Sequence, residues 1–176
     1  MKKMVYLSLG SNLGERRSNL RRALDHLRAL GAVTAVSSVY ETEPVEFRAQ
    51  PWFLNFAVAL ETELMPKQLL GRTQQIERKM GRRRYGGPFP AKKGPRAIDI
   101  DILLFGNVVV DTPQLVIPHL AMHERRFVLE PLAEIAPDVR HPVFHTTIRQ
   151  LRDAVAKQHQ AIRRVGDLLT GDSVRS

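Results

Sequence analysis

Two carboxylates, Asp99 and Asp101, interrupt an otherwise apolar segment that runs from residue 98 to residue 105. Successive side chains of a β-strand point to opposite faces, so this pattern predicts one face with both aspartates and another with isoleucines. Two carboxylates this close repel each other and lose hydration when they are buried. A divalent cation offsets that cost, and ligation by oxygen alone suits magnesium. The pair is therefore a candidate magnesium site.

Arg96 precedes the pair, and we expect its side chain on the same face as Asp99 and Asp101. An arginine beside a metal held by carboxylates suits the binding of phosphate groups. The alternative is a polar strand face exposed to water, on which Arg96 pairs with one of the aspartates. Clustered charges of this kind favour a functional site over a solvated surface.

The composition indicates a globular protein with an anionic partner. The chain has 176 residues and a formal net charge of +9, which leaves nucleic acid, anionic lipid and phosphorylated small molecules as candidate partners. Basic residues crowd into the Gly/Pro-rich segment 82–96, next to the aspartates, which favours a nucleotide over a polymer. The chain has no cysteine and no apolar run long enough for a membrane span, so we expect a cytoplasmic protein without a membrane partner.

The pattern of apolar residues predicts the elements that position these groups. Period-two segments predict strands over 4–9, 32–40, 53–61 and 98–105, and helical spacing predicts helices over 15–30 and 66–80. This order predicts an α/β (α+β) fold with a ferredoxin-like βαββαβ core, in which helices cover a mainly antiparallel sheet in three α-β-α layers. We further predict a strand over 108–110 after a turn at 106–107, and helices within 122–135 and over 147–155.

We expect one domain over residues 1–165, followed by a mobile basic tail over 166–176. No internal repeat or linker divides the chain.

Other motifs leave alternatives open. The segment 10–14, Gly-Ser-Asn-Leu-Gly, fits a phosphate cradle before a helix, although a tight turn with an N-cap is the more common arrangement. Gln74 and Glu77 share one stripe of the second helix, and spacing alone favours a solvated pair. Phe53 and Phe127 suit the stacking of a planar ligand, but core packing is the usual role of such residues. The chain has no P-loop motif and no Gly-x-Ser-x-Gly motif.

Several segments together resemble the 6-hydroxymethyl-7,8-dihydropterin pyrophosphokinase family of folate biosynthesis. The most specific is 94–103, Gly-Pro-Arg-Ala-Ile-Asp-Ile-Asp-Ile-Leu, and the others are Leu-Gly-Ser-Asn-Leu-Gly at 9–14, Tyr-Glu-Thr at 40–42, Gln-Pro at 50–51 with Phe-Leu-Asn at 53–55, and Pro-His at 118–119. The likeness covers about residues 4–135. It departs from the family at 82–93, which is longer, and at Lys93, where family members carry a tryptophan.

The resemblance implies a magnesium-dependent enzyme that transfers the β,γ-pyrophosphoryl group of ATP to the pterin and releases AMP. It implies two Mg²⁺ ions held by Asp99 and Asp101. The catalytic residues that it implies are Arg82, Arg96, Asp99 and Asp101. For the pterin it implies Thr42, Val45, Phe53, Asn55 and Phe127, and for ATP it implies Gln74, Glu77, Arg82, Arg96, Ile102, His119 and Arg125.

We therefore expect a monomeric enzyme that acts on two small molecules and binds no nucleic acid. The rival hypothesis is a basic ferredoxin-like RNA-binding module, which the net charge of +9 and the fold pattern motivate. Such a module needs aromatic side chains exposed on an open sheet face.

Overall fold

The structure is a computed structural model that describes residues 1–44, 49–81, 95–156 and 160–168. The elements follow one another in the order β1 (Lys3–Ser11), α1 (Arg16–Arg28), β2 (Ala32–Val36), β3 (Ser38–Thr42), β4 (Phe53–Thr62), α2 (Pro66–Lys79), β5 (Asp99–Phe105), β6 (Val110–Asp111), β7 (Val116–Ile117), a 3₁₀-helix η1 (Met122–Glu124), α3 (Arg126–Ile135), α4 (Ile148–Val155) and β8 (Ile162–Asp167).

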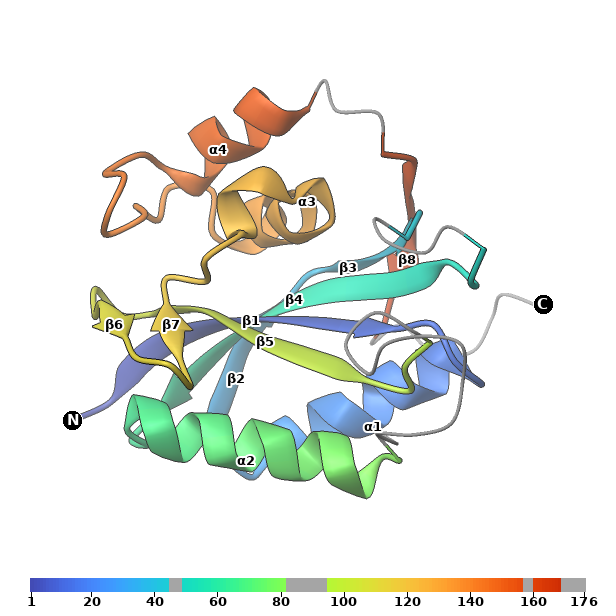
Figure 1. Cartoon of the computed structure of the whole chain (residues 1–176), viewed down its shortest axis with the longest axis horizontal. Helices are drawn as coiled ribbons and strands as arrows, with labels where there is room; N and C mark the ends of the chain where they lie inside the picture. The colour runs from blue at the N-terminus through green and yellow to red at the C-terminus, as the bar shows by residue number, and fades with distance from the viewer. Residues whose placement is uncertain (45–48, 82–94, 157–159, 169–176) are drawn as a thin grey trace.

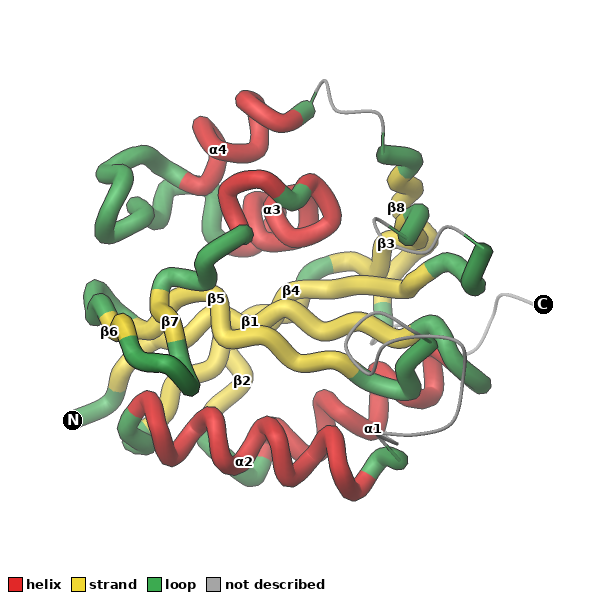
Figure 2. Tube along the Cα trace, in the orientation of Figure 1, coloured by secondary structure: helices red, strands yellow, loops and turns green. Residues whose placement is uncertain are grey.

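A six-stranded antiparallel sheet forms the centre of the molecule (Figure 2). Its strand order is β5-β1-β4-β3-β8, and β2 pairs with the other end of β4. With β2 and β3 counted as the two halves of one interrupted strand, the order from β1 to β5 is strand–helix–strand–strand–helix–strand, which confirms the ferredoxin-like core.

Helices cover both faces of this sheet (Figure 1), which confirms the three-layer arrangement. On one face α1 and α2 pack on the larger apolar cluster, to which β1 contributes its odd-numbered residues and α1 its buried leucines. On the other face α3 and α4 enclose a second cluster with the neighbouring strands. The sheet is thus buried between two apolar layers, and its polar residues must lie where a layer ends.

Two predicted strands need correction. The strand expected over 32–40 is interrupted at Ser37, whose hydroxyl donates to the carbonyl of Ser38 and accepts from the amide of Ala57. The strand expected at 108–110 begins only at Val110. It pairs with β7 and not with β5, although Gly106 does turn the chain there with φ +52.

The C-terminal segment also differs from expectation. Strand β8 pairs with β3 and runs through the predicted boundary between residues 165 and 166. Leu168 is 2% exposed and belongs to the larger apolar cluster. Residues 166–168 are therefore packed on the sheet, and residues 169–176 lie outside the described part of the chain.

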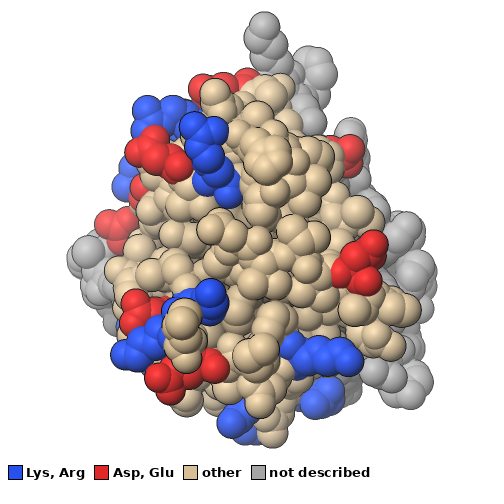
Figure 3. Space-filling model, turned by 90° about the vertical axis from the view of Figure 1, so that its left-hand side faces the viewer, with Lys and Arg blue, Asp and Glu red and all other residues tan. Residues whose placement is uncertain are grey.

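The arrangement does not suit the RNA-binding alternative, because helices cover both faces of the sheet. On the face drawn in Figure 3, basic and acidic side chains are interspersed around a broad uncharged area. The described part of that face therefore presents no continuous basic surface. No helix within the described ranges has the length and apolarity that a membrane crossing requires.

Candidate active site

The site begins with the register of three neighbouring strands. In the sheet Gly10 of β1 stands opposite Asn55 of β4 on one side and Asp99 of β5 on the other. Two residues earlier, Ser8 stands opposite Asp101. Because side chains alternate along a strand, these residues share the face that α3 partly covers. Asn55 and Asp99 therefore flank a position that carries no side chain.

Gly10 has to be a glycine at this place. A Cβ atom there would lie 2.6 Å from Oδ1 of Asn55 and 3.4 Å from a ring carbon of Phe53. The bare backbone thus leaves a hollow in the sheet surface, and Asn55 leans over it. A glycine within a strand often marks such a close approach.

A cavity of about 400 Å³ opens above this hollow. Its floor comes from β1, β4 and β5, one wall from the end of β3 and the residues after it, and the other wall from the segment around η1 and the start of α3. The lining residues are Ser8, Gly10, Thr42, Glu43, Pro44, Gln50, Phe53, Asn55, Arg96, Asp99, Asp101, Ala121, Glu124, Arg125 and Phe127. The cavity thus gathers eight of the site residues that the resemblance implied, together with seven other residues.

One end of the cavity combines an amide with two aromatic rings. Asn55 and Thr42 are both buried, and Nδ2 of Asn55 donates to Oγ1 of Thr42. Phe53 of β4 and Phe127 of α3 both line the cavity. The Arg125 guanidinium lies 5.6 Å from the Phe127 ring centre. Aromatic faces beside a fixed amide suit a flat heterocycle with a hydrogen-bonding edge.

The other end carries Arg96 and the two aspartates. Nη1 of Arg96 lies 3.0 Å from Oδ2 of Asp99. The ion pair expected for the alternative, a polar strand face, therefore does form. Nε of Arg96 is nevertheless buried and has no hydrogen-bond partner among the residues that the structure describes. A buried donor without a partner is costly, and an anionic ligand in the cavity would satisfy it. The arginine therefore fits a phosphate group better than a purely structural role.

His119 stands behind Asp101, with its Nε2 atom 3.9 Å from Oδ1 of that carboxylate. Its Nδ1 atom accepts from the amide of Ala121, so the neutral ring carries its proton on Nε2, on the side of Asp101. Burial, and to a smaller extent the charge of Arg125, lower the pKa of His119 to about 4, while the charge of Asp99 opposes this shift. The imidazole is therefore neutral at pH 7, and its Nε2–H group points toward the aspartate.

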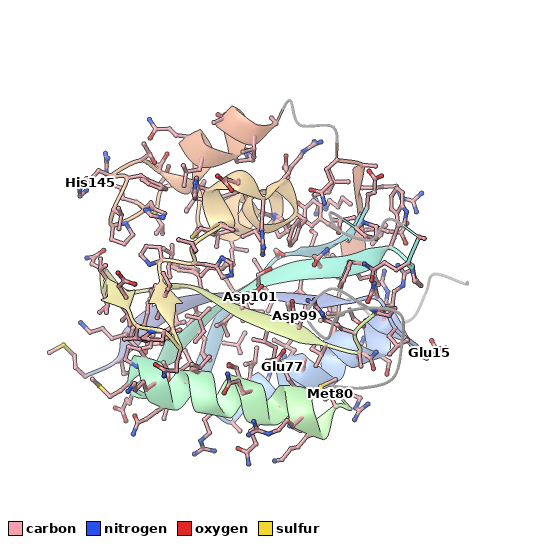
Figure 4. All side chains as sticks on the ribbon, viewed as in Figure 1. Glu15, Glu77, Met80, Asp99, Asp101 and His145 are labelled. Atoms are coloured by element: carbon pink, nitrogen blue, oxygen red, sulfur yellow. The ribbon has the colours of Figure 1, made fainter. Side chains whose placement is uncertain are left out.

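Asp99 and Asp101 are the residues that could hold a metal, and their side chains are 24% and 30% exposed. Figure 4 shows both on β5, at the sheet surface. In the described ranges no group of three or more His, Cys, Asp or Glu residues could hold a metal ion. Two carboxylates give only part of a magnesium ligand set, so the remaining oxygens would have to come from substrate and water.

Three of the other predicted nucleotide residues, Gln74, Glu77 and Ile102, are described by the structure and do not line the cavity. Gln74 is exposed on α2, whereas Glu77 on the same helix is 3% exposed and lies below the sheet (Figure 4). The expectation that this pair is solvated is therefore wrong for Glu77. The side chain of Ile102 packs in the larger apolar cluster, on the other face of β5. Val45 and Arg82 lie outside the described residues.

Asn12 is a buried residue whose role the sequence did not reveal. It is 1% exposed, and its Nδ2 donates to Oε1 of Gln50 at 2.9 Å and to the carbonyl of Pro51 at 3.0 Å. Its Oδ1 accepts from the amide of Arg96 at 2.7 Å, and its own amide donates to the Arg96 carbonyl. These bonds match neither role expected for segment 10–14, a phosphate cradle or a turn with an N-cap. The N-cap residue of α1 is Glu15, and it makes no side-chain cap bond. Asn12 instead holds the backbone of Arg96 in a fixed position relative to Gln50.

Comparison with known families now adds to this geometry. Residues 6–137 match the model of the 7,8-dihydro-6-hydroxymethylpterin-pyrophosphokinase (HPPK) family, which is most of the chain. The chain belongs to this family. It is 49% identical over 141 residues to 2-amino-4-hydroxy-6-hydroxymethyldihydropteridine pyrophosphokinase of Bacillus subtilis, a match that covers 79% of this chain and 81% of that protein. The enzyme of the same name from Pseudomonas aeruginosa is 45% identical over 140 residues, or 78% of this chain and 83% of the relative.

Solved structures support the fold of this family member. A crystal structure of the Plasmodium falciparum HPPK-DHPS protein superposes with a TM-score of 0.70 at 19% identity. That match covers 88% of this chain and 45% of the other, so the chain spans less than half of these longer proteins. At such low identity the likeness is evidence for the fold alone.

Proposed function

We propose that the cavity binds both substrates of the family reaction, with the pterin at its Asn55 end and the phosphates of ATP at its Arg96 end. The chain is a pyrophosphokinase of folate biosynthesis, which transfers pyrophosphate to 6-hydroxymethyl-7,8-dihydropterin and uses ATP as its co-substrate. The observation that supports the placement is the row Asn55, Gly10 and Asp99 across three adjacent strands. Adjacent strands lie about 4.8 Å apart, so the row places the backbones of Asn55 and Asp99 about 10 Å apart on the cavity floor.

At the pterin end, the proposal gives each residue a role that its chemistry suits. Asn55, held by Thr42, presents its amide to the edge of the heterocycle. Phe53 and Phe127 contact the two faces of the ring, which needs only flat apolar surfaces. The substrate hydroxymethyl group then points along the floor, over Gly10, toward Asp99.

At the phosphate end, Asp99 and Asp101 would hold magnesium, and we propose two ions as in the family resemblance. Magnesium when bound would neutralise the charge of the triphosphate and polarise the reacting phosphoryl group. Arg96, which lines the cavity, offers the N–H groups of its guanidinium to the phosphate oxygens. The hydroxyl oxygen of the pterin bonds to the β-phosphorus as its proton passes to solvent, the bond from that phosphorus to the oxygen of AMP breaks with the electron pair left on that oxygen, and AMP leaves. The protein groups act by orientation and by fixed charge, because no covalent intermediate is needed.

Several further assignments remain our proposals. Gln74, Glu77, Ile102 and His119 keep the nucleotide roles that the resemblance implies, although their side chains do not line the cavity. We also propose that the enzyme is monomeric and, as its lack of cysteine suggests, cytoplasmic. Light scattering of the purified protein would test the oligomeric state.

Nucleotide product analysis tests the reaction directly. The purified protein, ATP, magnesium and 6-hydroxymethyl-7,8-dihydropterin should give AMP, and AMP should be absent when the pterin is left out. Formation of ADP would instead indicate transfer of a single phosphoryl group. Omission of magnesium with a chelator should abolish AMP formation, and unchanged turnover under that condition would remove the metal from the proposal.

A further inference from the structure

The C-terminal strand contacts one wall of the cavity, although it lies beyond residue 137, where the match to the family model ends. Strand β8 continues the sheet beyond β3, with Ile162 opposite Thr42. The amide of Glu43 donates to the carbonyl of Ala161 at 2.9 Å, and the amide of Ala161 donates to Oε2 of Glu43 at 3.2 Å. Glu43 is thus held by the segment before β8 at both its backbone and its side chain, and Glu43 lines the cavity.

Gln160, which precedes this segment, reaches both walls. Its Nε2 donates to the carbonyl of Glu43 at 2.8 Å. Its own carbonyl accepts from Nη1 of Arg126 at 3.3 Å. Arg126 is the first residue of α3 and stands between Arg125 and Phe127, both of which line the opposite wall. One residue therefore joins the wall of Glu43 to the wall of Phe127.

Helix α3 is attached to its neighbours at both ends, and the connection through Gln160 lies at the end beside the cavity. At the far end of that helix, the carboxylate of Glu134 accepts from the hydroxyls of Ser38 and Tyr40, at 2.6 Å and 2.8 Å. These bonds attach α3 to β3 away from the cavity. At the near end, Arg126 is oriented by Glu130 at 3.3 Å and bonded to Gln160. The separation between Phe127 and the sheet thus depends on the contacts at both ends of α3. Gln160 makes one of the contacts at the end beside the cavity.

We propose that Gln160 is a positioning residue that sets the width of the pterin slot by bridging Glu43 and Arg126. The role given to the slot rests on the proposed function of the cavity. The bridge itself does not touch the reacting atoms. Its loss should therefore weaken pterin binding, raise the KM for the pterin, and leave both kcat and the affinity for ATP close to those of the wild type.

Two substitutions at Gln160 test the bridge. Gln160→Ala removes the donor, and Gln160→Glu keeps the length of the side chain but replaces the amide donor by an acceptor that faces the Glu43 carbonyl. Arg163→Ala is the matched control, because Arg163 lies on the same segment, is 72% exposed and pairs with Glu41, which does not line the cavity. Titration calorimetry with the pterin and a non-hydrolysable ATP analogue should show about three- to tenfold weaker pterin binding in both Gln160 variants, as for one lost hydrogen bond. The control should bind as the wild type does.

Amide hydrogen exchange provides a readout that needs no ligand. The Glu43 amide should lose protection in Gln160→Ala and keep it in Arg163→Ala. Wild-type pterin affinity and KM in Gln160→Ala would overturn the proposal, and so would an equal loss of affinity in the control. Should the wild type form no AMP at all, the proposed function would fail, while the exchange at Glu43 would still decide whether the bridge exists.

Discussion

Substitution of Gly10 by alanine should disturb the pterin end of the cavity more than any other change of one methyl group. The added Cβ would lie 2.6 Å from Oδ1 of Asn55, whereas ordinary contacts begin at about 3.4 Å. Asn55 or the β1 backbone must therefore give way by about 0.8 Å, the difference between these two distances. Asn55 is 4% exposed and bonded to Thr42, so it has little room to move.

The expected cost follows from these contacts. Overpacking in a buried site costs about 1–3 kcal/mol, and displacement of the Asn55 amide from Thr42 would add about 1 kcal/mol for the lost hydrogen bond. The free energy of unfolding should therefore fall by about 2–4 kcal/mol. Pterin affinity should fall by more than about tenfold, because the amide that faces the ring edge is the group that moves.

Urea unfolding and calorimetric titration with the pterin measure the two effects. Gly71→Ala is the control, because Gly71 lies in helix α2 with no atom within 4 Å of the added Cβ. That change should stabilise the protein by about 0.5–1 kcal/mol through helix propensity and leave pterin binding unaltered. If Gly10→Ala unfolded like the wild type and bound the pterin as tightly, the absence of a side chain at position 10 would have no importance for the site.

Three further predictions follow from the same geometry. Asp99→Asn and Asp101→Asn should each slow AMP formation by at least about 100-fold while circular dichroism shows an intact fold, and a variant with a near-normal rate would lose its place in the site. Asn12→Asp should lower the free energy of unfolding by about 3 kcal/mol in urea, because the new carboxylate cannot donate to Gln50; equal stability would mean that this contact carries little energy. His119 has a folded-state pKa of about 4, below the ordinary 6.5, so the folded state takes up its proton less readily and stability should fall as the pH drops from 6.5 toward 4. His119→Gln should reduce this loss, and the same loss in both proteins would contradict the assignment.

The local pattern was sufficient to predict the two faces of β5. Ile98, Ile100 and Ile102 are buried in the larger cluster, while Asp99 and Asp101 face the cavity. Alternation along a strand is a property of the backbone, so it is readable without any knowledge of the neighbours. The same holds for the helical spacing that predicted α1 and α2 within a few residues.

Polar residues were harder to interpret, because their burial depends on partners far along the chain. Glu77 was expected to be solvated but is 3% exposed on α2. Asn12 was taken for part of a turn or a phosphate cradle, but its partners Gln50 and Arg96 lie 38 and 84 residues away. The sequence analysis predicts no strand over β8 and assigns its last two residues to a basic tail, because nothing in this segment shows that β3 has a free edge for it.

The sequence by itself determined most elements of the core, the ferredoxin-like order and the family, since these depend on periodicity and on motifs that lie within short segments. It also indicated that Asp99, Asp101 and Arg96 carry the chemistry of the phosphate end. The tertiary structure alone decided the shape of the cavity. Only the register of β4, β1 and β5 places Asn55, Gly10 and Asp99 in one row, and only the packing of α3 brings Phe127 over that row. Register and packing are set by contacts between distant residues, which no local pattern contains.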